Sequence, residues 1–237
     1  MNPISNKTPI PVAFKLKEIV PWGRSLEEYA QFFNLSQEDR RKRILGCGDG
    51  PASFNTEMSK LGHQVVSVDP LYQFEVTDIA ARFEDCFDDV IGQVSATPDR
   101  WNWDYHRNPE QLGQNRRRVM EAFLADFPSG LQSGRYRCAA LPELPFDANE
   151  FDLVLCSHLL FLYSEHLSED FHVRSVLELG RVAREIRIFP LLTLAQQRSP
   201  HLEAVTRSMR NNGWSVNFVS VRGGFQIGAG EMLHLHR

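Results

Sequence analysis

A glycine-rich segment, Gly46-Cys47-Gly48-Asp49-Gly50, restricts the possible folds of this 237-residue chain more than any other feature. It follows the apolar pair Ile44-Leu45, which predicts a strand, and it precedes a helical pattern that Gly62 is placed to end. A second strand is expected over residues 64–68. A strand, a tight turn, a helix and another strand fit a crossover between parallel strands. The helix should bury one face, consisting of Phe54, Met58 and Leu61.

The remainder of the chain continues the alternation of strands and helices. Apolar segments predict strands over residues 135–139, 151–156, 185–189, 215–221 and 231–236, and helical periodicity predicts helices over residues 169–184 and 201–211. Gly223-Gly224 joins the last two strands, which predicts a terminal hairpin. Short amphipathic segments before the glycine-rich turn predict a helix over residues 25–33 and another after the capping signal at residues 36–39.

Residues 71–134 are too long for a simple connection between two strands. Two stretches of this segment have a helical period of apolar residues, and an aromatic linker over residues 98–106 separates them. We interpret the segment as a helical insertion that caps the mouth of the sheet within a single domain spanning residues 1–237. Its aromatic side chains form either an acceptor pocket or a small core of their own, and they are Trp101, Trp103 and Tyr105.

The composition predicts a globular protein whose main partner is not nucleic acid. Hydrophobic residues make up 42% of the chain, enough for a full-sized core. The formal net charge is -4, whereas proteins that grip nucleic acid usually carry a basic excess. The two dense basic runs, residues 40–43 and 116–118, are expected to be solvated helix faces.

The cysteine spacing and the hydropathy favour a cytoplasmic protein without a metal site or a membrane span. No two of the four cysteines form a CxxC motif, and Cys138 and Cys156 are expected to be buried thiols. The longest apolar stretch, residues 151–163, is shorter than the roughly 18–20 residues of a membrane span. The first twenty residues are expected to form a loose arm without the apolar core of a signal peptide.

The glycine-rich turn and Asp69 together predict a site for an adenosine cofactor. Glycine lets the backbone turn sharply and approach a ligand closely, and amides at the start of a helix donate to an anionic group. Asp69 ends the second strand about twenty residues later, where a carboxylate accepts the hydroxyls of a ribose. The nicotinamide fingerprint would place its last glycine at Pro51, so pyrophosphate binding is disfavoured.

The segment from Ile44 to Asp69 resembles the first motif of class I S-adenosylmethionine-dependent methyltransferases. Leu144-Pro145-Phe146 followed by Phe151-Asp152-Leu153-Val154 resembles a later signature of the same superfamily. The resemblance implies an α/β fold with a Rossmann-like, mostly parallel sheet of seven strands in the order 3-2-1-4-5-7-6, with an antiparallel last strand. It implies S-adenosylmethionine as the cofactor, and the expected contacts are Gly46, Cys47, Gly48, Gly50, Asp69, Pro70, Tyr72, Ala140, Leu141, Ser157 and Arg24.

Several of these candidates also have a purely structural interpretation. Arg24 is expected either to pair with the cofactor carboxylate or to be an ordinary surface arginine. Tyr72 either flanks the adenine or packs in the core. His158 and Tyr163 are the candidate catalytic residues, since a base is needed only when the acceptor must lose a proton. His158 could equally be hydrogen-bonded within the packing.

Two positions depart from the superfamily pattern and keep a second function open. Ile44 stands where an acidic residue usually orients the methionine end of the cofactor, and Ala140 stands near the place of an acidic residue beside the adenine. The first interpretation of the function is methyl transfer. The acceptor is expected to be a small molecule, because the sequence contains no Asn/Asp-Pro-Pro-Tyr/Phe tetrapeptide. The alternative is a non-catalytic protein that binds S-adenosylmethionine or S-adenosylhomocysteine. A nicotinamide oxidoreductase is a third interpretation, against which Pro51 and the terminal hairpin argue.

Overall fold

A seven-stranded sheet organises the computed structural model, which describes residues 14, 16 and 19–237. Its strand order is β3-β2-β1-β4-β5-β7-β6, the order that the family resemblance implied. β1 to β5 pair in parallel, whereas β7 is antiparallel to both β5 and β6. The strands are β1 (Ile44–Cys47), β2 (Val65–Val68), β3 (Tyr136–Arg137), β4 (Leu153–Ser157), β5 (Glu185–Phe189), β6 (Ser215–Ser220) and β7 (Glu231–His236).

Helices cover both faces of the sheet, which explains why the central strands are apolar without interruption. Side chains of a strand alternate between the two faces. In β4, Val154 and Cys156 join the core beneath α5 (Glu169–Val182) and α6 (Leu202–Asn211). Leu153 and Leu155 join the opposite core, beneath α1 (Leu26–Phe32) and α2 (Phe54–Lys60). Every residue of β4 is buried, as expected for a parallel strand covered on both sides.

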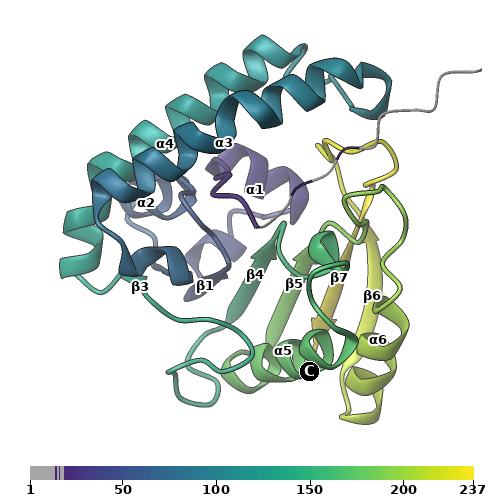
Figure 1. The fold of residues 1–237 in the computed structure, drawn as a ribbon. Coiled ribbons are helices and arrows are strands. Elements are labelled where there is room, and N and C mark those ends of the chain that lie inside the picture. Colours follow the sequence, from purple (N-terminus) through teal and green to yellow (C-terminus); the bar gives the residue numbers. More distant parts are fainter. Residues whose placement is uncertain (1–13, 15, 17–18) are drawn as a thin grey trace, which may run out of the picture.

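The insertion forms two long helices that lie across the carboxyl edge of the sheet (Figure 1). They are α3 (Val76–Ala96) and α4 (Pro109–Gln132), and Asn108 caps the second by accepting from the Gln111 amide. Their apolar faces pack on each other through Ile79, Phe83 and Phe123. In open α/β sheets ligands bind at this edge, so the insertion is placed to cover a ligand.

A capping box holds the start of α1. The Ser25 hydroxyl accepts from the Glu28 amide, and the Glu28 carboxylate accepts from the Ser25 amide at 3.0 Å. This arrangement fixes the first turn of α1 beside the glycine-rich loop. Most of the arm expected over residues 1–20 lies outside the described residues. Within the described part, none of the helices combines the length and apolar character needed to cross a bilayer.

Four local expectations were wrong. Leu61 is 58% exposed, because α2 ends at Lys60 and Leu61 is already part of the turn that leads into Gly62. Cys138 is exposed, because β3 is only two residues long and ends before it. The helix expected after residue 36 is a single 3-10 turn over Asp39–Arg41. Arg116 is buried rather than solvated, because its guanidinium pairs with a buried carboxylate.

Candidate functional site

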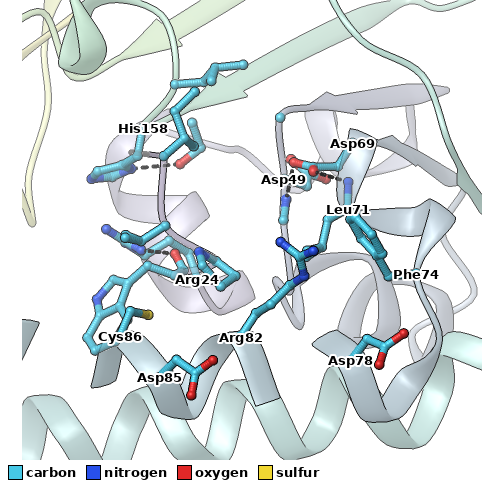
Figure 2. Close-up of a pocket in the computed structure, with 18 of the residues that line it drawn as sticks. Arg24, Asp49, Asp69, Leu71, Phe74, Asp78, Arg82, Asp85, Cys86 and His158 are labelled. Atoms are coloured by element: carbon cyan, nitrogen blue, oxygen red, sulfur yellow. Dashed lines mark hydrogen bonds between the residues drawn. The ribbon is translucent and has the colours of Figure 1, made fainter. Parts of the chain in front are cut away.

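A cleft of about 770 Å³ opens at the carboxyl ends of β1, β2 and β4. The glycine-rich loop and the end of β2 form one wall, the segment before α1 forms the facing wall, and α3 lies across the opening (Figure 2). Arg24 and His158 lie on one side of the cleft, and Asp49 and Asp69 lie on the other. The two walls therefore carry opposite charges.

Asp69 is fixed at the end of β2 by two backbone amides. Its Oδ2 accepts from the Gly50 amide at 2.9 Å, and its Oδ1 accepts from the Leu71 amide at 2.8 Å. Burial raises the pKa of Asp69, and the two backbone hydrogen bonds partly offset this rise. A carboxylate has about four acceptor positions, so two remain for a ligand.

The glycines of the loop adopt a backbone conformation that other residues rarely use. Gly48 has φ +69° and Gly50 has φ +53°. A side chain at Gly48 would also clash with Leu159. The loop therefore keeps its backbone open to the cleft only with glycine at this position.

Asp49 lies in the same loop and is buried, 6% exposed. Its Oδ1 accepts from the Tyr29 hydroxyl at 2.7 Å, and its Oδ2 accepts from the Ser67 hydroxyl at 2.5 Å. The carboxylate lies against Gly46, where any side chain would collide with it. Burial raises the pKa of Asp49 to about 7, although the two hydroxyls oppose this shift. Asp49 was not among the contacts expected from the sequence, which from this segment were Gly46, Cys47, Gly48 and Gly50.

Arg24 forms the basic wall and belongs to a buried ionic cluster. Arg116 on α4 donates to Glu28 at 2.7 Å and 2.5 Å, and His106 lies 3.5 Å from the same carboxylate. Arg24 lies 3.9 Å from Glu28 and donates to the Trp22 carbonyl. Burial opposes ionisation of Glu28, but Arg116 holds its pKa well below the usual range. The cluster thus contains two guanidinium groups and one carboxylate, which leaves positive charge at the cleft.

His158 follows β4 in a left-handed conformation, φ +54°. Its Nδ1 lies 2.9 Å from the Ser157 hydroxyl, and its ring packs against Phe32 and Phe189. Burial lowers the pKa of His158 well below 6.5, and Arg24 acts in the same direction. The imidazole is therefore neutral at pH 7, the form in which it can accept a proton. Strained conformations of this kind are often found at functional sites.

The structure brings together six of the predicted site residues at the cleft: Arg24, Gly48, Gly50, Asp69, Ser157 and His158. The other predicted residues lie outside its lining: Gly46, Cys47, Pro70, Tyr72, Ala140, Leu141 and Tyr163. Gly46 and Cys47 are buried within β1. The Tyr72 ring packs against Phe123, Phe127 and Tyr136 and donates to the Gly50 carbonyl at 2.8 Å, so it is a core residue here. Leu141 is buried in the core beneath α5, whereas Ala140 is exposed.

One face of α3 lines the cleft, and the sequence analysis missed it. Asp78, Arg82 and Asp85 are spaced by four and three residues, which places them on one side of a helix. This spacing is a signal that the sequence contains. Arg82 reaches from α3 toward the acidic wall, with its guanidinium carbon 4.0 Å from the centre of the Phe74 ring (Figure 2).

A smaller cavity of about 90 Å³ adjoins the cleft, and the two share Val20, Trp22, Arg24 and His158. Its lining is mostly apolar and includes Trp101 and Tyr163. Gln226 also lines it: its Nε2 donates to the Thr193 carbonyl at 2.8 Å, whereas its buried Oε1 has no hydrogen-bond partner among the residues that the structure describes. Trp101, Trp103 and Tyr105 all line a separate surface cleft beside residues 221–230, and of the three only Trp101 also lines the small cavity.

Comparison with known proteins gives one related sequence and several similar folds. No model of a known protein family matches the chain. An uncharacterized protein of Methanocaldococcus jannaschii is 27% identical over 213 residues, which cover 90% of this chain and 96% of that protein. Among solved structures, a magnesium protoporphyrin IX methyltransferase from Synechocystis PCC 6803 with bound S-adenosylmethionine is 13% identical, over 83% of this chain and 70% of that one, with a TM-score of 0.42. A TehB-like S-adenosylmethionine-dependent methyltransferase from Corynebacterium glutamicum is 14% identical, over 83% and 80% of the two chains, with a TM-score of 0.41.

Proposed function

We propose that the chain binds S-adenosylmethionine in the cleft and transfers its methyl group to a small-molecule acceptor. The observation that carries this proposal is the pairing of Asp69 and the open glycine loop on one wall with Arg24 on the facing wall. Asp69 would hold the ribose hydroxyls, and Arg24 would hold the carboxylate of the methionine part. The strand order, which is the one that the sequence resemblance implied, supports the same cofactor.

The residues at the site fit this cofactor in charge. The acidic wall suits the cationic part of the cofactor, and Arg24 suits its carboxylate. Burial lowers the pKa of Arg24 to about 9, so the guanidinium still carries its charge at pH 7. When bound, the cofactor supplies an activated methyl group on a positively charged sulfur. The protein's part is to hold the acceptor in line with that group and to exclude water.

The small cavity beside the cleft is the proposed place of the acceptor. It shares Arg24 and His158 with the cleft, so a group in the cavity would face the cofactor. The free Oε1 of Gln226 would accept a hydrogen bond from an N–H or O–H group of the acceptor. His158, which borders both the cleft and the small cavity, would take up a proton where the acceptor must lose one. Residues 71–134 would serve as the cap that closes the site.

A non-catalytic cofactor-binding protein is the second candidate, and Ile44 and the exposed Ala140 favour it. Such a protein would use the acidic and basic walls of the cleft in the same way. It would not need the small cavity or a base at His158. The two candidates therefore differ in the acceptor side of the site and agree on the cofactor side.

Calorimetry with S-adenosylhomocysteine tests the cofactor side. The wild-type protein should bind this ligand and should not bind NADH. Asp69→Ala should weaken binding about tenfold or more, because a hydrogen bond to a charged group contributes about 1.5–3 kcal/mol. Asp152→Ala is a matched control, since this half-exposed aspartate pairs with Arg43 at the start of β1, away from the cleft lining. Unchanged affinity in Asp69→Ala would remove Asp69 from the site.

A transfer assay tests the acceptor side. The purified protein is incubated with S-adenosylmethionine and a panel of small phenols, thiols and amines, and formation of S-adenosylhomocysteine is followed by mass spectrometry. Turnover should fall in Gln226→Leu while the affinity for S-adenosylhomocysteine stays unchanged. Cofactor binding without turnover across the panel would favour the non-catalytic candidate.

A further inference from the structure

Asp49 is a buried carboxylate that forms no ion pair with a cation among the described residues. It accepts from the hydroxyls of Tyr29 on α1 and Ser67 on β2, and Asp69 acts on it through charge. It acts in turn on Tyr72, Cys47 and Cys156. None of these groups carries a positive charge at pH 7. Burial raises the pKa of the tyrosines and thiols among them, which keeps these groups uncharged.

The described cationic side chains that line the cleft are Arg24 and Arg82, and neither forms an ion pair with Asp49. Arg24 interacts with Glu28 on the facing wall. Arg82 is exposed, its guanidinium lies over the Phe74 ring, and among the described residues it forms no ion pair with Asp49 or Asp69. A buried carboxylate without a cation costs free energy that the fold does not recover by itself. A cationic ligand in the cleft would supply the missing partner.

We infer that Asp49 makes the cleft select the positively charged sulfonium of S-adenosylmethionine over the neutral thioether of S-adenosylhomocysteine. The inference rests on the proposed function and adds a residue to it. Ile44 occupies the place where the resemblance leads one to expect an acid at the methionine end. Asp49 lies five residues later, in the loop that follows β1, and lines the cleft, so it would supply a carboxylate to that end by a different route.

The two ligands differ by one unit of charge at the sulfur, so their affinity ratio measures the effect of Asp49. With Asp49 ionised, attraction falls on the sulfonium and not on the thioether. This favours entry of the methyl donor and departure of the product. Because the positive charge at sulfur disappears as the methyl group leaves, this attraction stabilises the bound donor more than the transition state, so it favours ligand exchange and does not accelerate the chemical step.

The selection should depend on pH with a sign that follows from the burial of Asp49. In the ligand-free protein Asp49 has a pKa of about 7, so its carboxyl group is increasingly protonated as the pH falls below 7. A bound cation stabilises the ionised form, and binding then releases a proton. Affinity for S-adenosylmethionine should therefore rise between pH 6 and pH 8 more than affinity for S-adenosylhomocysteine. The neighbouring tyrosines and thiols stay neutral in this range; they are Tyr29, Tyr72, Cys47 and Cys156. The ribose contact proposed for Asp69 is the same for both ligands, so Asp69 does not contribute to the preference.

Isothermal calorimetry with three ligands tests the inference. They are S-adenosylmethionine, S-adenosylhomocysteine and sinefungin, whose amine places a positive charge near the position of the sulfonium. At pH 8 the two cationic ligands should bind more tightly than S-adenosylhomocysteine. Asp49→Asn should reduce this preference about tenfold, as expected for the loss of about 1.4 kcal/mol of selective attraction. Affinity for S-adenosylhomocysteine should change by less than about threefold, because the neutral thioether of that ligand gains no charge attraction from Asp49.

Asp85→Asn is the matched control, since Asp85 is an exposed carboxylate on α3 that lines the same cleft. An exposed charge is screened, so the preference should stay as in the wild type. An equal loss of preference in Asp85→Asn would show that total charge and not Asp49 sets the selection, which would overturn the inference. An unchanged preference in Asp49→Asn, with S-adenosylhomocysteine still bound, would overturn it while leaving the proposed function intact. Failure of the wild type to bind any of the three ligands would overturn the proposed function itself.

Ser67→Ala provides an independent test that keeps the carboxylate. Loss of the hydroxyl that donates to Oδ2 removes support for the ionised form. The midpoint of the pH-dependent preference should then move upward by about one pH unit, a shift that a purely structural role of Ser67 would not produce. An unmoved midpoint in a folded Ser67→Ala protein would count against Asp49 as the titrating group.

Discussion

The two walls of the cleft are built in different ways. The acidic wall comes from residues 49–71, in which the Gly50 and Leu71 amides hold Asp69 and the Ser67 hydroxyl holds Asp49, with one further hydrogen bond to Asp49 from Tyr29 on α1. The basic wall depends on the pairing of Glu28 with Arg116, which are separated by 88 positions in the sequence. The acidic wall is thus built mainly on the sheet and its loops, whereas the basic wall includes a contact between the insertion and α1. The comparison indicates that the two sides of the site should respond differently to mutation.

Breaking the buried ion pair should have the largest effect, and it should act on the basic wall alone. Glu28→Gln leaves Arg116 and Arg24 without their anion in a buried place. Removing one partner of a buried pair typically costs about 3–5 kcal/mol, which urea denaturation would measure as a lower midpoint. Glu84→Gln, which breaks the exposed pair with Arg117, should change stability by less than about 0.5 kcal/mol. Similar losses in both variants would contradict the assignment of Glu28 as the central anion.

Gly48→Val should break the acidic wall without unfolding the sheet. The added side chain clashes with Leu159 and is disfavoured at φ +69°. Affinity for S-adenosylhomocysteine should fall about a hundredfold, or about 2.7 kcal/mol, in calorimetry. Gly92→Ala on α3, where an added carbon meets nothing within 4 Å, should bind like the wild type. Normal binding by Gly48→Val would mean that the loop is only a structural turn.

Asp49→Asn should sharpen the comparison by making the ligand-free protein more stable. Burial raises the folded pKa of Asp49 from 3.8 to about 7, so the folded state holds this proton longer than the unfolded chain does. Stability of the wild type should therefore fall as the pH rises from about 4 to about 7. Asp49→Asn should lose much of this slope and gain on the order of 2 kcal/mol at pH 8. An identical pH profile for the two proteins in thermal denaturation would show that Asp49 ionises normally.

Tyr72→Phe should have the smallest effect. The substitution removes the hydrogen bond to the Gly50 carbonyl and keeps the ring among Phe123, Phe127 and Tyr136. Stability should fall by about 1 kcal/mol, as for a typical hydrogen bond. Affinity for S-adenosylhomocysteine should stay within about twofold, since the ring lies outside the cleft lining. A tenfold loss of affinity would place Tyr72 against the ligand after all.

The sheet could be predicted closely because each of its strands carries a local signal. β5 and β7 begin and end where the apolar pattern does, and the order of the strands followed from the resemblance. The prediction for β3 was less accurate, because only two of its residues pair with β2. Side-chain exposure at the ends of elements, as for Leu61 and Cys138, depends on where the chain turns, and a short pattern does not fix that point.

The acidic wall was largely accessible to sequence analysis, and the basic wall was not. Asp69 and the glycines are marked by their spacing, so their place at the cleft could be expected. Arg116 sits in a run of three arginines that looks like a solvated face. Its spacing from Leu112 and Phe123, both buried, is the overlooked signal that it points inward. The identity of its partner needed the fold, because nothing in the sequence links α4 to α1.

The close fit of the Asp49 carboxylate against Gly46 has a consequence for the evolution of this loop. Any side chain at position 46 would occupy the space of that carboxylate, so the two positions cannot vary independently. In related chains, alanine or serine at position 46 should occur only where position 49 carries a smaller residue than aspartate. Such covariation would preserve the turn while discarding the charge, and it would mark lineages in which the loop has exchanged its electrostatic role for a simple one in packing.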